Sequence, residues 1–117
     1  YNFSSNYPDV IDNGYPDGIG AEVYDVDALN EVWSTSKDPR NREHPHTNFY
    51  EHPGKFKLGI MMCRPEIRRP DIIIYVNTQD QYDFVLAMYE YLYPRNTQFT
   101  ILDIIDWYDN VYKKVQA

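Results

Sequence analysis

A short loop near the start of the sequence has the residues needed to bind a hydroxyl-bearing ligand. Tyr-Pro-Asp-Gly-Ile-Gly occupies 15–20, and Glu22 follows it. Glycines let backbone N–H groups approach a ligand, and the carboxylates of Asp17 and Glu22 can accept hydrogen bonds from hydroxyls. The loop lacks the Lys-Ser/Thr pair of a P-loop, and no predicted strand precedes it. A substrate loop and a plain turn therefore both stay open as interpretations.

A second candidate site is the segment Asn-Thr-Gln-Asp at 77–80, between a predicted strand and a predicted helix. Ligands of open α/β sheets gather outside the carboxyl ends of the strands. The Asp80 carboxylate could hold a divalent cation there, and the first N–H groups of the helix could meet an anion. The simpler interpretation, which the residues alone favour, is that Thr78 and Asp80 cap the helix and balance its dipole.

Three histidines and one cysteine complete the chemically reactive side chains. His44, His46 and His52 lie close together in sequence, but their spacing matches no zinc motif, so solvated or locally bonded imidazoles are expected. Cys63 ends an apolar segment beside Arg64, and we expect a buried structural thiol rather than a nucleophile.

The amino-acid composition limits the classes of protein to which this chain can belong. The 117 residues are 43% hydrophobic and 25% charged, with a net charge of −7, so a folded α/β domain is expected and a general nucleic-acid binder is not. No apolar run is long enough to span a membrane. A single cysteine fits a reducing compartment, and we expect a cytoplasmic protein. Because the sequence does not begin with Met, we expect it to be part of a longer protein.

The first half of the chain is expected to form a loop followed by short elements. Asn, Asp, Gly, Pro and Ser dominate residues 1–20, which predicts a loop. Alternating polar and apolar residues predict a strand at 22–26. Asp27 is the predicted N-cap of a helix that buries Leu29, Val32 and Trp33. A helix at 42–52 and a strand at 56–63 follow.

The second half contains the strongest patterns. Five β-branched or aromatic residues at 72–76 predict a strand covered on both faces. Thr78 and Gln81 have capping-box spacing at the start of a helix that Pro94 ends. Its predicted apolar stripe consists of Tyr82, Val85, Leu86, Tyr89 and Leu92. A terminal helix at 100–117 is expected to bury Ile101, Ile104, Ile105, Tyr108 and Val115, which completes an α/β pattern.

Four segments, taken in order, resemble one family. They are Tyr-Pro-Asp-Gly at 15–18 leading to Glu22; Arg-Glu-His at 42–44 with Tyr-Glu-His-Pro at 50–53; Val-Asn-Thr-Gln-Asp at 76–80; and the helix pair at 89–105. The chain is similar to the cytidylyltransferases that resemble spore coat polysaccharide biosynthesis protein F, relatives of the acylneuraminate and ketodeoxyoctulosonate cytidylyltransferases.

This resemblance implies the C-terminal half of a nucleotide-diphospho-sugar-transferase fold, a Rossmann-like α/β/α sandwich. It implies Mg²⁺-dependent transfer of CMP from CTP to a sugar for surface polysaccharide, with release of pyrophosphate, and a homodimer. The Gly-rich, Arg/Lys-rich loop that holds the CTP phosphates in this family is not found in the sequence. The chain by itself is therefore expected to be inactive.

Carried over to this sequence, the resemblance assigns Asp17, Gly18 and Glu22 to the sugar. It places Arg42 and His44 near the sugar or a partner subunit. Asn77 would be the second metal ligand, but it stands where the family has Asp, and Asp80 remains the carboxylate of this segment that could hold a cation.

Two further departures from the family occur, because Gly20 replaces an Asp and Gln79 replaces a Pro. An alternative is therefore a non-catalytic sugar-binding or dimerisation module with a degenerate metal site.

Overall fold

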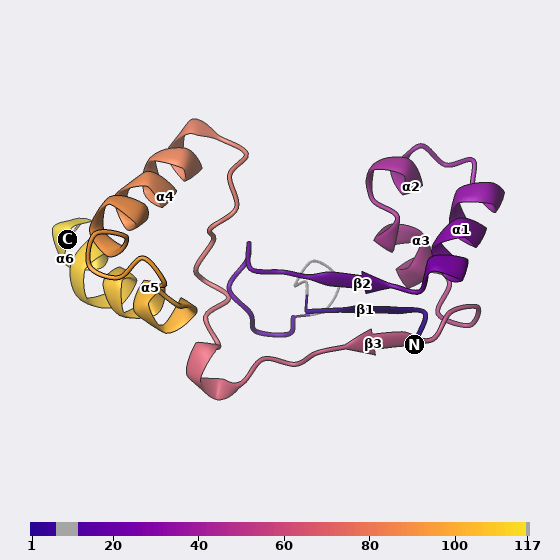
Figure 1. The fold of residues 1–117 in the computed structure, drawn as a ribbon, viewed down its shortest axis with the longest axis horizontal. Helices are drawn as coiled ribbons and strands as arrows, with labels where there is room; N and C mark the ends of the chain where they lie inside the picture. Colours follow the sequence, from indigo (N-terminus) through magenta and orange to yellow (C-terminus); the bar gives the residue numbers. More distant parts are fainter. Residues whose placement is uncertain (7–11, 117) are drawn as a thin grey trace. The chain divides into compact units, whose positions relative to one another are not determined.

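The chain contains both helices and strands and divides into two compact units (Figure 1). The computed structural model describes residues 1–6 and 12–116. The first unit contains Tyr1–Asn13 and Gly20–Met62, and the second contains Gly14–Ile19 and Cys63–Ala117. The Tyr-Pro-Asp-Gly loop and the predicted strand at 22–26 thus belong to different units.

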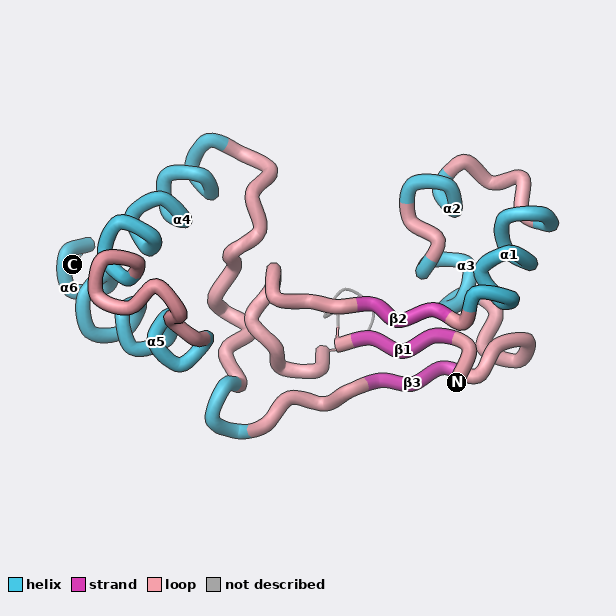
Figure 2. The backbone as a smooth tube through the Cα atoms, viewed as in Figure 1, coloured by secondary structure: helices cyan, strands magenta, loops and turns pink. Residues whose placement is uncertain are grey.

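A three-stranded sheet forms the base of the first unit (Figure 2). Its strands are β1 (Phe3–Ser5), β2 (Glu22–Tyr24) and β3 (Leu58–Ile60), in the order β2-β1-β3. β1 is antiparallel to β2 and parallel to β3. The prediction of a loop over residues 1–20 is wrong at β1, since three residues are too few to show a period and their partners lie far along the chain. Residues 7–11 of that predicted loop lie outside the described residues.

Three helices accompany this sheet: α1 (Val26–Thr35), α2 (Arg40–Glu43) and α3 (His46–Glu51). The N-cap of α1 is Asp25 rather than the predicted Asp27, because Asp25 Oδ1 accepts the Asp27 N–H at 2.9 Å.

The predicted helix at 42–52 is broken between α2 and α3. Pro45 has no N–H and disfavours helical backbone in the residue before it, so His44 adopts φ −130° and ψ 77°.

Aromatic rings fill the core of the first unit. Its buried members are Phe3, Ala28, Val32, Phe49 and Phe56. Figure 1 shows α1, α2 and α3 gathered at the end of the sheet where β2 ends and β1 begins. Trp33, a predicted core residue, is 65% exposed.

The second unit is built from helices. They are α4 (Gln79–Leu92), α5 (Ile101–Trp107), the π-helical turn η2 (Tyr108–Tyr112) and α6 (Lys113–Gln116), with a short 3-10 turn η1 (Pro65–Ile67) before them. The capping box at the start of α4 is confirmed, since Thr78 Oγ1 accepts the Gln81 N–H and Gln81 Oε1 accepts the Thr78 N–H. The predicted terminal helix is confirmed over 101–116 with a π turn in its middle.

The predicted strand at 72–76 is wrong. Within the described residues this segment makes a single bridge, Asp17 to Ile73, in which the Asp17 N–H donates to Ile72 O and the Ile74 N–H donates to Asp17 O. Ile72 is fully buried, but Ile73 and Val76 are 41% and 48% exposed. A strand covered on both faces needs neighbours along its length, and one bridge does not supply them. A Rossmann-like sheet is therefore not confirmed.

The core of the second unit lies between α4 and α5. It consists of Ile72, Met88, Leu92, Ile104 and Trp107. Of the predicted α4 stripe only Leu92 is buried, and the side chains of Tyr82, Leu86 and Tyr89 are 41–51% exposed. The side of α4 that carries Phe84, Met88 and Leu92 faces the core instead. The centroids of the Phe84 and Trp107 rings are 5.5 Å apart. Val115, also predicted as apolar core, is 76% exposed.

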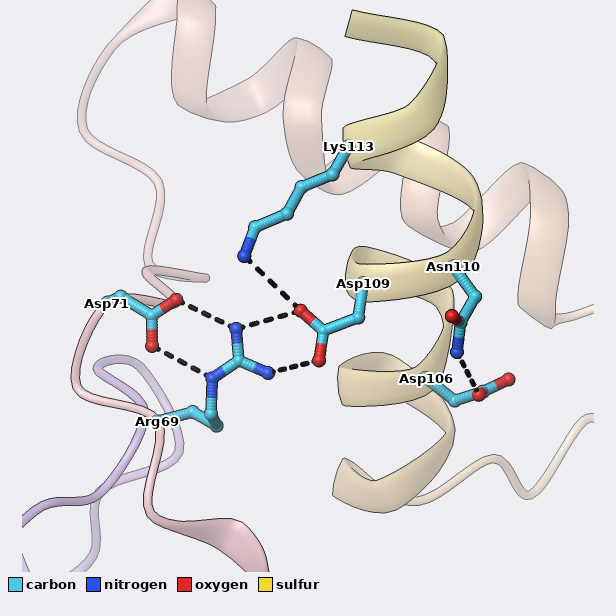
Figure 3. Close-up of polar contacts among 6 residues, drawn as sticks. All are labelled: Arg69, Asp71, Asp106, Asp109, Asn110 and Lys113. Atoms are coloured by element: carbon cyan, nitrogen blue, oxygen red, sulfur yellow. Dashed lines mark hydrogen bonds and ion pairs between the residues drawn. The ribbon is translucent and has the colours of Figure 1, made fainter. Parts of the chain in front are cut away.

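An ion cluster links the segment after η1 to the π turn (Figure 3). The Arg69 guanidinium lies between two carboxylates, bonding Asp71 at 2.8 and 2.9 Å and Asp109 at 2.5 and 2.9 Å. Lys113 Nζ is 3.3 Å from Asp109. The bonds from Arg69 lower the pKa of both Asp71 and Asp109.

These two lowered pKa values predict an acid-dependent loss of stability in the second unit. The stabilisation is complete above the ordinary carboxylate pKa of about 4 and disappears as the pH falls through the lower folded-state values. Because both carboxylates are more than a third exposed, we expect at most about 1 kcal/mol. Urea unfolding from pH 6 to pH 2 should show this loss, and Arg69→Met should flatten it.

The matched control for this experiment is Arg95→Met. The Arg95 guanidinium contacts the Tyr91 ring and carbonyl, so its removal changes charge without releasing these carboxylates. An equal pH dependence in the Arg69→Met variant and the wild type would contradict the prediction.

No helix among the described residues has the length and apolar character to cross a membrane.

Candidate functional site

A polar pocket of about 330 Å³ lies in the first unit, between the start of β2 and the α2–α3 junction. It is lined by Gly20, Glu22, Glu43, His44, Pro45 and His46. The break at Pro45 shapes it, since the turn brings the His44 and His46 rings to 5.4 Å between centroids. Two imidazoles and two carboxylates thus share one small concave surface.

Glu22 is the more sheltered acid of this pocket, and it makes two polar contacts. Its Oε2 accepts a hydrogen bond from the Tyr24 hydroxyl at 2.6 Å, and its Oε1 lies 3.0 Å from His46 Nδ1. Both side chains are sheltered, with 25% of Glu22 and 16% of His46 exposed. Since a carboxylate only accepts, the contact assigns the Nδ1–H tautomer or the imidazolium to His46. Glu22 therefore orients His46.

Tyr24 supports this pair from the neighbouring position on the same face of β2. Burial raises the pKa of Tyr24, and its hydrogen bond to Glu22 and the negative charge of Glu22 raise it further. The phenol therefore stays protonated and continues to donate to Glu22.

The predicted residues Arg42 and His44 separate in the structure. His44 lines the pocket, with Nε2 at 3.6 Å from Glu43 Oε1. Arg42 lies with its guanidinium carbon 3.5 Å from the centroid of the Trp33 ring, a cation–π contact. Arg42 lines a different pocket, of about 220 Å³, with Trp33 and Asn41. The structure thus brings Glu22 and His44 together and places Arg42 elsewhere.

Asp17 and Gly18 belong to the second unit. Gly18 has φ +112°, a conformation that non-glycine residues rarely adopt, and the Asp17 backbone pairs with the segment at 72–74. The turn interpretation of this loop is confirmed locally, and the predicted sugar-binding role of both residues stays a prediction.

Asn77 and Asp80, the residues predicted to bind a metal, lie at the start of α4. The Asn77 N–H donates to Gln81 Oε1 at 2.7 Å, and Asp80 is exposed in the first turn of the helix. In the described part of the chain, no three His, Cys, Asp or Glu side chains are grouped as a metal site would require. The observed contacts are those of a helix cap.

Cys63 is partly exposed, so the prediction of a buried thiol is wrong. Its Sγ donates to Arg64 O at 3.3 Å. Desolvation raises the pKa of the Cys63 thiol although Arg68 and Arg64 oppose the change, and a raised pKa disfavours the nucleophilic thiolate.

Sequence reasoning missed Tyr24 and the role of His46. The two-residue period of a strand places Tyr24 on the same face as Glu22, so the first of these contacts was readable from the sequence. The Glu22–His46 contact joins residues 24 positions apart and needed the fold.

The site and the fold define a mixed α/β protein with a His/Glu pocket beside a three-stranded sheet. The chain is 28% identical over 92 residues to Uncharacterized protein MJ1063 of Methanocaldococcus jannaschii. The match covers 79% of this chain and 37% of that protein, so the chain spans little more than a third of the length of this relative. No family model matches the sequence, and no solved structure matches the fold.

Proposed function

We propose that this chain is part of a nucleotidyltransferase that transfers CMP from CTP to a sugar for surface polysaccharide and releases pyrophosphate. The observation that carries the proposal is the pocket. In it Glu22, which the family resemblance assigns to the sugar, and His44, which it places near the sugar or a partner subunit, line one concavity with His46. Its volume is at the lower end of the range for small-molecule sites and suits one sugar ring. We propose a cytoplasmic location on the same resemblance.

In the proposed reaction a sugar oxygen attacks the α-phosphorus of CTP, and pyrophosphate leaves. The contribution of this chain is to bind and orient the sugar. Glu22 fixes His46, and the more exposed Glu43 and His44 offer hydrogen-bond partners to ring hydroxyls.

Mg²⁺ is implied by the resemblance, but the described residues do not fit a complete site for it. Mg²⁺ prefers several oxygen ligands that include carboxylates. Asn77 offers one neutral oxygen, and Asp80 lies in an exposed first turn. The described residues therefore supply at most part of a Mg²⁺ site.

We expect the protein that contains this chain to release pyrophosphate from CTP in the presence of Mg²⁺ and an accepted sugar. The variant Asn77→Asp, which restores the acid that the family resemblance expects, should raise Mg²⁺-dependent turnover about tenfold, which corresponds to about 1.4 kcal/mol in the activation barrier. The 117 residues by themselves should release none. A coupled pyrophosphate assay over a panel of sugars measures all three.

Asn96→Asp is the matched control, since it adds the same charge to an exposed loop of the second unit. No pyrophosphate from the complete protein with any sugar, while a known cytidylyltransferase works alongside, would refute the proposal.

A second candidate is a non-catalytic sugar-binding or dimerisation module. It is favoured by Asn77 and by an exposed stripe along α4 and its C-cap, formed by Tyr82, Leu86, Tyr89 and Tyr93. Their 4-3-4 spacing is the heptad spacing of helix–helix seams, so we propose a homodimer for this case. Unchanged turnover in the Asn77→Asp variant, with sugar binding intact, would favour the module.

A further inference from the structure

We infer that the pocket formed by Glu22, Glu43, His44 and His46 selects a neutral sugar and rejects sugars that carry a carboxylate. This inference rests on the proposed function, because it names the substrate class of the same pocket. It follows from the charges that line the pocket and from the position of the nearest arginines.

The lining of the pocket carries two carboxylates and no guanidinium or ammonium group among the described residues. Glu22 is held in place by Tyr24 and His46, so it cannot swing away from an incoming anion without losing both contacts. Glu43 is 79% exposed at the rim. While both carboxylates are ionised, charge on the two imidazoles could at most balance theirs, so the lining carries no net positive charge.

The arginines nearest in sequence are engaged elsewhere. Arg42, next to Glu43, stacks on Trp33 at 3.5 Å. Arg40 binds Asp38 at 2.6 Å and Glu51 at 3.3 Å, and its bonds to Asp38 lower the pKa of that carboxyl. A sugar acid is usually held by such a guanidinium, in a paired arrangement of two N–H donors and two oxygens. This pocket does not offer that arrangement.

Hydroxyl groups suit the same lining well. Carboxylates accept hydrogen bonds from hydroxyls, and a neutral imidazole can both donate and accept. Gly20 leaves backbone without a side chain at the edge of the pocket, where the family resemblance expects an acid. A polyhydroxylated ring without a carboxylate therefore meets complementary groups and no repulsion.

The test compares sugars that differ only in a carboxylate. Methyl α-D-glucopyranoside and methyl α-D-glucuronide form one such pair, and the galacto and manno pairs extend it. Each is titrated into the ¹⁵N-labelled chain at constant ionic strength, and amide shifts of Gly20, Glu22, His44 and His46 report binding. We expect the preferred neutral sugar to bind at least about tenfold more tightly than its acid, a difference of about 1.4 kcal/mol, because the acid adds a third negative charge beside the two carboxylates of the pocket.

The variant Glu43→Gln should reduce the ratio of the two affinities, neutral sugar to acid. The control Glu31→Gln removes an exposed carboxylate paired with Lys55 and should leave this ratio unchanged. An acid that shifts the pocket amides and binds as tightly as its neutral partner would overturn the neutral-sugar inference and leave the proposed function standing. Absence of shifts in these amides with every sugar would refute both, because the pocket would then not be a sugar site.

Discussion

Replacing Phe49 with alanine is expected to lower the free energy of unfolding of the first unit by about 3–5 kcal/mol. The side chain is fully buried, and its ring lies 4.5 Å from Phe56, 5.4 Å from Phe3 and 5.5 Å from Tyr24. Truncation therefore removes the shared contact of three other rings and leaves a cavity. Urea unfolding followed by amide hydrogen exchange measures the loss and assigns it to residues.

The matched control is Tyr1→Ala, which removes an aromatic side chain that is 75% exposed and should change stability by less than about 1 kcal/mol. Because Phe49 and His46 share α3, the Phe49→Ala variant should also lose the Glu22–His46 contact. Equal destabilisation by the two variants would show that Phe49 is not the centre of this core.

Gly18→Ala is expected to disrupt the Tyr-Pro-Asp-Gly turn. A φ of +112° costs a non-glycine residue about 1–3 kcal/mol. A Cβ at this position would lie 2.6 Å from the Tyr75 nitrogen and 2.8 Å from the Ile74 carbonyl carbon, and these backbone atoms cannot rotate away as a side chain can. We therefore expect the stability loss to exceed the conformational cost alone, with loss of exchange protection at the Asp17 and Ile74 amides.

Gly54→Ala provides the comparison, since a Cβ there meets nothing within 4 Å. Its stability should remain within about 0.5 kcal/mol of the wild type. Retained protection of the Asp17 and Ile74 amides in the Gly18→Ala variant would show that the turn tolerates a side chain.

Local patterns in the sequence predicted the start of α4 and the extent of the terminal helix. The Thr78–Gln81 capping box was readable because both of its hydrogen bonds join residues three positions apart. The break at Pro45 could be predicted only in part. Proline disfavours helical backbone in the preceding residue, but the turn that carries His44 and His46 also depends on how α3 packs through Phe49.

The sheet was predicted poorly for an equally physical reason. β1 reads as loop because its stability comes from β2 and β3, whose residues lie about 20 and 55 positions away. The run at 72–76 reads as a buried strand, but only Ile72 is fully buried. The apolar side chains of a segment indicate that it can be buried. Whether it becomes a strand of a sheet depends on other segments of the chain that must pair with it.

The sequence by itself determined the cap formed by Thr78 and Gln81, and it predicted Glu22 and His44 as candidate ligand-binding residues. The tertiary structure alone decided that Glu22 orients His46, that Arg42 stacks on Trp33 outside the pocket, and that Asp17 lies in a different unit from Glu22. Residue types and short spacings are local properties of the chain. The charge of a pocket, by contrast, depends on tertiary packing, because packing decides which side chains from distant parts of the sequence line the pocket and which lie outside it.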